Sequence, residues 1–173
     1  MLNEFSVKDL YPLALAEGEG MGTAYEYYVK RMALGRFLAG LPRPGKILIA
    51  GLPQKYGASL DFLLLASELG AEITIVDERR QAIERVRDSL GALDKIAGAP
   101  TIRPPALQIV ADLDSLASID ATFDMAVSSE VLQRLSPQGR ERYVHRLSRL
   151  AASLALFCQN ADNEAHNSRS GLA

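Results

Sequence analysis

Short, predominantly apolar runs alternate with segments of helical periodicity along this sequence. A strand that is apolar throughout is covered on both of its faces, and strands of this kind separated by helices form parallel sheets. The runs lie at 46–50, 72–76, 107–110, 123–127 and 154–158. We therefore expect an α/β fold, a three-layer αβα sandwich around a mostly parallel sheet of about five strands.

Capping residues indicate where the helices begin and end. Thr23 followed by Glu26 forms a capping box, and Gly40 follows the segment, which predicts a helix over 23–39. Serine followed by proline at Ser136 is typical of a helix start. Further helices are expected over 58–69, 83–90 (ending at Gly91) and 136–152. We divide the chain into a helical lid segment at 1–44, a core at 45–160 and a polar tail at 161–173.

Composition excludes several classes of function. The single cysteine, Cys158, allows no intramolecular disulfide, and two distant histidines do not suggest a metal site. A net charge of −2 gives no field that would attract nucleic acid or an anionic membrane. No apolar run reaches the roughly 20 residues of a membrane span, and the N-terminus lacks the order of a secretory signal. We expect a cytoplasmic protein with no nucleic-acid or membrane partner.

Candidate ligand-binding residues follow the predicted strands, because open parallel sheets bind ligands at the carboxyl ends of their strands. The turn after the first strand begins at Gly51 and includes Gly57, but matches neither the P-loop nor the dinucleotide fingerprint. It is equally well explained as a plain turn or as a ligand loop. Asp77 ends the second strand, where a carboxylate can accept both hydroxyls of a ribose or cap the next helix. Glu78 could share the ribose or face solvent, and Asp112 could read an adenine amino group or stabilise a turn.

Five segments follow one another in the order KILIAG, EITIVDE, IVADLDSL, FDMAVSSEVLQRLSPQGRERYVHRLSRLA and LALFCQN. This order resembles that of the class I S-adenosylmethionine-dependent methyltransferases, and the resemblance covers residues 20–160. It implies a Rossmann-like core that binds S-adenosylmethionine, leaves S-adenosylhomocysteine as the product, and methylates an acceptor that we expect to be a small molecule. It also implies cofactor-binding roles for Gly51, Leu52, Pro53 and Gly57 (glycine loop), Asp77 and Glu78 (ribose), Asp112 and Leu113 (adenine), Ser128 with its neighbour Ser129 (sulfonium side), and Tyr28 with Tyr25 and Tyr27 (lid).

Two departures from the family pattern keep a second interpretation open. Ile49 stands where the family has an acidic residue, and Pro53 replaces the second glycine of the loop. We also expect the sheet to lack the family's usual last two strands. The alternative is a non-catalytic or truncated binding domain, in which Pro53, Tyr56 and lid tyrosines fill the pocket. A dinucleotide-dependent oxidoreductase is a third interpretation, but its fingerprint is absent.

Catalytic residues are not indicated by the sequence. Methyl transfer from a sulfonium needs positioning more than acid–base chemistry, and positioning can contribute about 7–11 kcal/mol. His145 and His166 are both more easily explained as solvated side chains. An unpaired sheet edge and the apolar parts of the N-terminal helix also suggest a homodimer.

Overall fold

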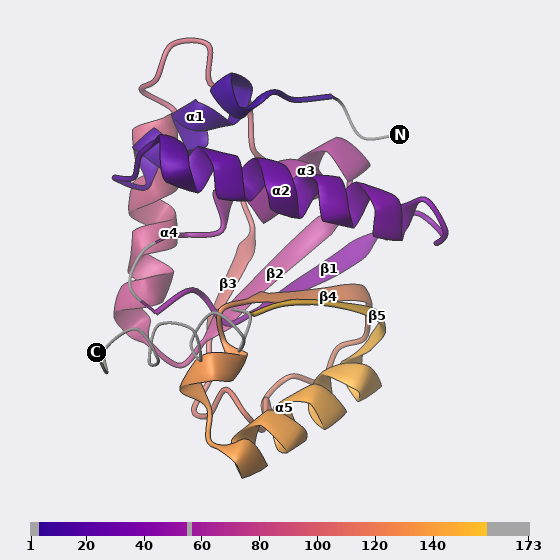
Figure 1. The fold of residues 1–173 in the computed structure, drawn as a ribbon. Helices are drawn as coiled ribbons and strands as arrows, with labels where there is room; N and C mark the ends of the chain where they lie inside the picture. Colours follow the sequence, from indigo (N-terminus) through magenta and orange to yellow (C-terminus); the bar gives the residue numbers. More distant parts are fainter. Residues whose placement is uncertain (1–3, 55–56, 159–173) are drawn as a thin grey trace, which may run out of the picture.

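A five-stranded, fully parallel sheet forms the centre of the structure, a computed structural model that describes residues 4–54 and 57–158 (Figure 1). The strand order is β3-β2-β1-β4-β5, which confirms the predicted α/β class. The strands are β1 (Lys46–Ala50), β2 (Glu72–Asp77), β3 (Ala106–Ile109), β4 (Phe123–Ser129) and β5 (Ala151–Phe157). Along the sheet, the strand order reverses direction between β1 and β4.

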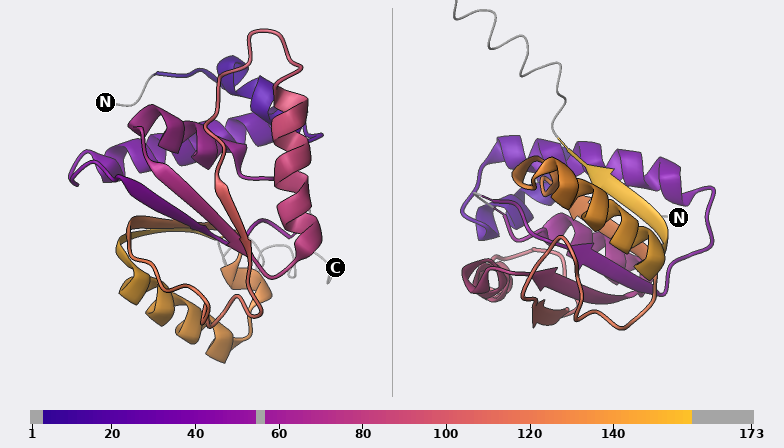
Figure 2. Two further views of the ribbon diagram at one scale, coloured as in Figure 1. Left: turned by 180° about the vertical axis from the view of Figure 1, so that it is seen from behind. Right: turned by 90° about the horizontal axis from the view of Figure 1, so that it is seen from below.

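Helices cover both faces of this sheet (Figure 2). One face carries α1 (Val7–Ala16), α2 (Met21–Leu38), α3 (Leu60–Leu69) and α4 (Arg80–Leu93). The other face carries η1 (Leu132–Arg134) and α5 (Pro137–Leu150). Alternation along β1 explains the division, because Ile47 and Ile49 pack with the first group while Leu48 and Ala50 pack with α5. None of the described helices is both long and apolar enough to cross a membrane.

The N-terminal helices differ from the sequence prediction. The capping box lies at Ser6 and Asp9 of α1, a helix that we did not predict. The predicted capping box at Thr23 is wrong, because α2 begins two residues earlier after Gly20, which makes no side-chain cap. Thr23 therefore lies within the first turn, where its hydroxyl donates to Glu19 instead.

Two other boundaries differ from the sequence prediction. Helix α4 continues through Gly91 to Leu93, and the burial of Leu93 offsets the cost of about 1 kcal/mol for a glycine inside a helix. Strand β5 begins at Ala151, immediately after α5, where a longer helix had been expected. The predicted start of α5 is confirmed, since the Ser136 hydroxyl accepts a hydrogen bond from the Gly139 N–H at 3.1 Å.

A long loop replaces a crossover helix between β3 and β4. Residues 110–122 contain no helix, yet their apolar side chains are buried in the cluster that α5 also joins. The buried members are Val110, Leu113, Leu116 and Ile119. Much of the second face is therefore covered by loop residues, and these bring Leu113 against the carboxyl end of the sheet.

Candidate functional site

The carboxyl edge of the sheet gathers most of the buried polar side chains of the described residues. It includes the reversal of strand order between β1 and β4, which is where open α/β sheets bind ligands. Among the eight buried polar or charged residues in the described ranges, six lie at strand ends or in segments that leave this edge: Ser59, Asp61, Asp77, Asp114, Ser128 and Ser129. Buried polar groups are costly and concentrate at functional sites, so this edge is the candidate site.

The Asp77 carboxylate is buried at the end of β2, with 0% of its surface exposed. Its Oδ2 accepts the Leu52 N–H at 2.8 Å, and its Oδ1 accepts the backbone N–H and the Nε–H of Arg79 at 2.8 and 2.9 Å. Burial by itself would raise the pKa of Asp77, but the hydrogen bonds from Arg79 and Leu52 hold it below its usual value. Asp77 is therefore ionised, and its own chain occupies both of its oxygens. It does not act as the N-cap of α4, which is Arg79.

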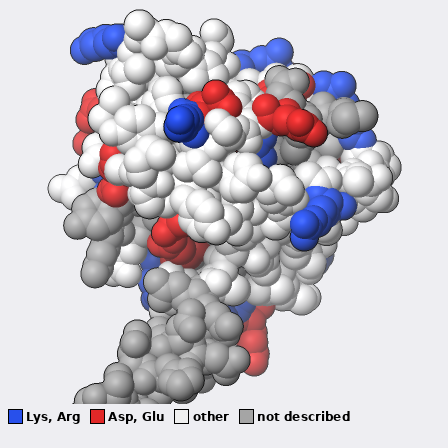
Figure 3. All heavy atoms as spheres, turned by 45° about the horizontal axis from the view of Figure 1, so that its top comes forward, with Lys and Arg blue, Asp and Glu red and all other residues white. Residues whose placement is uncertain are grey.

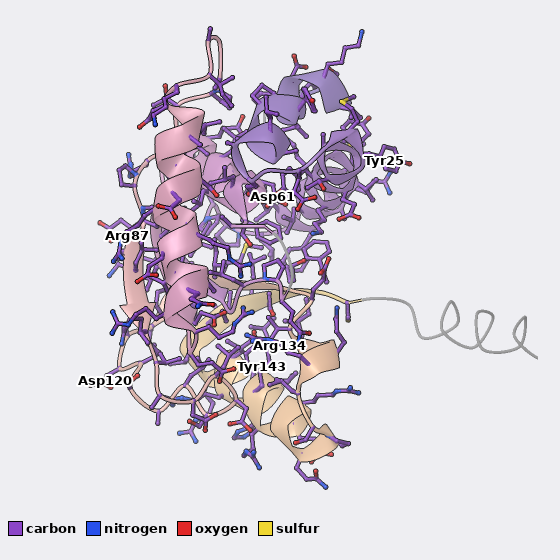
Figure 4. All side chains as sticks on the ribbon, turned by 90° about the vertical axis from the view of Figure 1, so that its left-hand side faces the viewer. Tyr25, Asp61, Arg87, Asp120, Arg134 and Tyr143 are labelled. Carbon is purple, nitrogen blue, oxygen red and sulfur yellow. The ribbon has the colours of Figure 1, made fainter. Side chains whose placement is uncertain are left out.

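Glu78 follows Asp77 directly, and its carboxylate is the accessible one of the two, with 37% of its side chain exposed. Its Oε2 accepts the Leu113 N–H at 3.1 Å. Arg134, which is 10% exposed, lies between the two acids, with nitrogens 3.3 Å from Asp77 Oδ2 and 3.5 Å from Glu78 Oε1. Figure 4 shows Arg134 close to Tyr143, on the α5 side of the sheet. An arginine from η1 thus occupies the acidic end of β2.

Position 51 requires glycine, both because of its backbone conformation and because of the little space around it. Its φ is +78°, and a Cβ there would come within 2.8 Å of the Leu113 and Val131 side chains and 3.4 Å of an Arg134 nitrogen. These residues cover the loop, together with the buried Leu52. In the alternative interpretation Pro53, Tyr56 and lid tyrosines fill this space, whereas the side chains that lie on Gly51 are those of Leu113 and Val131; Tyr56 lies outside the described residues.

Glu17, at the C-terminal end of α1, closes the far end of the glycine loop. Its Oε1 accepts the Leu60 N–H of α3 at 2.9 Å, and the Tyr27 hydroxyl donates to its other oxygen. A Cβ at Gly57 would lie 3.1 Å from Glu17 Oε2. Burial raises the pKa of Glu17 to about 7, although its hydrogen bonds act in the opposite direction. Sequence reasoning missed Glu17, because nothing local to it indicates a contact with a helix more than 40 residues away.

The two serines at the end of β4 face opposite sides of the sheet, as neighbours in a strand do. The Tyr143 hydroxyl donates to the Ala50 carbonyl at 2.5 Å and lies 2.7 Å from the Ser128 Oγ. Ser128 is thus held against α5. The Ser129 Oγ is buried and has no hydrogen-bond partner among the described residues. Of the two, Ser129 has the hydroxyl that remains available to a ligand.

Left-handed backbone at non-glycine residues also occurs at this edge. Ser59 (φ 58°) precedes α3, and Glu130 (φ 59°) follows β4. Each such residue costs about 1–3 kcal/mol and persists only where the surrounding structure holds it, often at binding sites. The Glu130 N–H donates to the Phe157 carbonyl at 2.8 Å, which fixes the turn after β4.

The remaining predicted site residues are divided between two places. Asp112 is exposed at the rim, where its Oδ1 accepts the Asp114 N–H at 3.3 Å, and the buried Leu113 lies on Gly51. Tyr28 is not brought to the loop. It lines a groove of about 1420 Å³ that also includes Pro44 and Leu69, near the amino edge of the sheet. Of the three lid tyrosines, Tyr27 is the one that contacts the loop region, through Glu17.

No protein-family model and no curated protein sequence matches the chain. Several solved structures do. Magnesium protoporphyrin IX methyltransferase (ChlM) from Synechocystis PCC 6803, with bound S-adenosylhomocysteine, aligns over 100% of this chain and 69% of its own with a TM-score of 0.58 at 13% identity. The same enzyme with bound S-adenosylmethionine gives a TM-score of 0.55 at 14% identity, over 79% of this chain and 64% of its own.

The chain has the fold of the class I S-adenosylmethionine-dependent methyltransferases. A structure from work on the conversion of a disulfide bond into a thioacetal group during echinomycin biosynthesis also matches, with 26% identity and a TM-score of 0.51 over 69% of this chain. The chain spans 44% of the length of that protein. Within residues 4–54 and 57–158, no three His, Cys, Asp or Glu side chains are placed to hold a metal ion.

Proposed function

We propose that this chain binds S-adenosylmethionine at the carboxyl edge and transfers its methyl group to a small-molecule acceptor. The acid pair Asp77 and Glu78 at the end of β2, within a methyltransferase fold, is the observation that carries the proposal. Asp77 already positions the glycine loop through Leu52, and Glu78 is open to solvent on one side. The pair can therefore hold the loop and accept ribose hydroxyls at once.

Binding requires Arg134 to leave the acid pair. Its contact with Glu78 is long at 3.5 Å, and its Nε is buried without a hydrogen-bond partner among the described residues. Arg134 is therefore held imperfectly, and a ribose that accepts and donates hydrogen bonds can replace it. Displacement of Arg134 would also uncover Gly51. The adenine could then lie along Leu113, with Asp112 at the rim.

Ile49 stands where the family has an acidic residue, and in this proposal Glu17 supplies a carboxylate in its place. It reaches the loop at Gly57 from α1, and the buried Asp61 lies in the first turn of α3. An ammonium group placed here would favour the ionised form of Glu17, whose pKa of about 7 leaves the group partly protonated near neutral pH. We propose that the amino group of the cofactor's methionine moiety lies at Glu17 and Ser129.

The transfer itself needs no acid or base from the chain. A lone pair of the acceptor forms the new bond to the methyl carbon, the sulfonium–methyl bond breaks, and its electron pair remains on sulfur as S-adenosylhomocysteine forms. The acceptor then loses a proton to solvent. Holding the two reactants at attack distance can supply about 7–11 kcal/mol, so positioning accounts for the catalysis.

A non-catalytic binding domain is the second candidate, and one observation favours it. Both Asp77 oxygens are occupied by Leu52, Arg79 and Arg134, and Leu113 and Val131 lie on Gly51. If this arrangement is permanent, no ribose can reach the acid pair.

Calorimetric titration with S-adenosylhomocysteine separates the two candidates. We expect micromolar binding by the wild type, weaker binding by Glu78→Gln, and tighter binding by Arg134→Ala because the competing guanidinium is removed. Arg149→Ala is the matched control, since Arg149 is exposed in the last turn of α5, away from the carboxyl edge. Absence of heat at millimolar ligand in both the wild type and Arg134→Ala would reject the proposal in favour of the binding domain.

A further inference from the structure

The outward face of α2 is apolar. The buried side of this helix is formed by Ala24, Tyr27, Arg31 and Leu34. On the opposite side, residues spaced by four, four and three positions form a stripe along the helix, with each between 45% and 59% exposed. We call these residues the α2 stripe: Met21, Tyr25, Val29 and Met32. A surface helix normally carries polar residues on this side, so the stripe indicates a partner.

The surface around the α2 stripe carries few charges and adjoins a groove. Tyr25 projects outward from α2 in Figure 4, whereas Asp61 lies inside, between α2 and the sheet. Figure 3, turned to bring the top of Figure 1 forward, shows a wide area with few charged side chains. Met32 also lines the groove of about 1420 Å³ beside Phe5 and Leu41, so the stripe adjoins a concave surface whose lining also includes charged residues such as Arg36 and Arg43. The flat stripe and the groove together form one surface.

Charge placement on α2 identifies the partner. Within α2, all of which is described, the charged residues among the exposed positions are Glu26 and Arg36. Ten residues apart, they project 80° from each other around the helix axis: Arg36 points between Tyr25 and Val29, within the stripe, and Glu26 lies on one flank of it. Two antiparallel copies of α2 crossing near Val29 place Arg36 of each copy about one turn from Glu26 of the other. In a parallel pair the two Arg36 side chains would instead face each other. The surface is therefore complementary to itself when the two helices run antiparallel.

Small residues permit a close approach of two such helices. A Cβ at Gly22 would meet nothing within 4 Å, and Ala33 is exposed on the same flank. Helix α2 has 18 residues and is therefore about 27 Å long, enough for a full helix–helix contact. Residues 159–173, the longest part of the sequence outside the described ranges, are polar and offer no apolar segment to cover the stripe.

We propose that the α2 stripe is the interface of a homodimer in which two α2 helices pack antiparallel. The dimer buries Tyr25, Val29 and Met32 against their copies and forms two reciprocal Arg36–Glu26 pairs. The partner is a second copy of this chain. This proposal is independent of the methyl-transfer proposal, because it uses no residue of the carboxyl edge.

Sedimentation equilibrium of the purified chain tests the dimer. We expect twice the chain mass of 18.8 kDa at micromolar concentration. Val29→Glu should give a monomer with an unchanged circular dichroism spectrum, since Val29 is exposed in the single chain. Ile109→Glu is the control, because Ile109 is an exposed apolar residue on β3, at the edge strand of the sheet.

Charge exchange tests the antiparallel orientation. Arg36→Glu should raise the dissociation constant at least tenfold, and Glu26→Arg combined with Arg36→Glu should recover most of the affinity. Failure of the double variant to recover would overturn the antiparallel arrangement. A wild-type monomer at millimolar concentration would overturn the dimer and assign the stripe to a different protein or to another part of a longer polypeptide.

Discussion

Replacement of Glu17 by glutamine should remove much of the pH dependence of stability. Glu17 is enclosed by Tyr27 and the N-terminus of α3, and burial raises the pKa of its carboxyl from 4.5 to about 7. Glutamine keeps a carbonyl oxygen that can accept the Leu60 N–H, and its amide nitrogen can donate to the Tyr27 hydroxyl oxygen in place of the bond that Glu17 accepts. It introduces no charge, so the folded state no longer binds a proton that the unfolded state lacks.

The magnitude follows from the pKa difference. A rise from 4.5 to about 7, at about 1.4 kcal/mol per unit, gives about 3 kcal/mol as an upper value. Because the pKa is higher in the folded state, this stability is fully present below about pH 4.5 and is lost as the pH rises through 7. Asp61, with its pKa raised to about 6 mainly by burial, adds a loss of the same sign at lower pH.

Urea unfolding at pH 5 and pH 8.5 measures this difference. We expect the wild type to lose 2–3 kcal/mol more than Glu17→Gln between the two pH values. Glu19→Gln is the control, because Glu19 is a nearby acid that contacts Thr23 rather than α3. Equal pH dependence in the wild type and Glu17→Gln would refute the reasoning.

Three further substitutions test the packing of the site and of α1 by thermal or urea unfolding. Gly51→Ala should lose about 2–4 kcal/mol, since its Cβ would meet two side chains at 2.8 Å and its φ is +78°; a loss below 1 kcal/mol would contradict the close contacts. Tyr143→Phe should lose about 1–2 kcal/mol, because the Ala50 carbonyl and Ser128 lose a buried partner; wild-type stability would argue against those bonds. Ser6→Ala should lose about 1 kcal/mol through the α1 cap, and no loss would mean that the cap is not formed in solution.

The central strands were the most predictable, because β1, β2 and β4 are buried on both faces along most of their length, whereas the edge strands β3 and β5 are partly exposed. A strand such as β1 must then be apolar at nearly every position, as it is from Ile47 to Ala50, and this pattern needs no knowledge of the partner strands. Helix α1 was not predicted, because it is short and contains Pro12, which is usually a helix breaker. Its burial against α2 stabilises a segment whose local sequence does not favour a helix.

The candidate site was predictable in position but not in detail. Asp77 was identified because it ends a buried strand, yet its contacts with Arg79 and Arg134 depend on side chains from two distant segments, the start of α4 and η1. Whether Ser128 or Ser129 faces the ligand depends on the register of β4, which sequence patterns define only to within a residue or two. Tyr28 was assigned to the lid by resemblance, while the orientation of α2 directs it into the groove instead.

A crystal structure of the chain grown with S-adenosylhomocysteine tests the central proposal most directly. We predict the ribose hydroxyls within 3.2 Å of the Asp77 or Glu78 carboxylate, the adenine along Leu113, and Arg134 displaced from the acid pair. A structure obtained at millimolar ligand in which Arg134 still bridges Asp77 and Glu78, with no nucleoside at this edge, would contradict it.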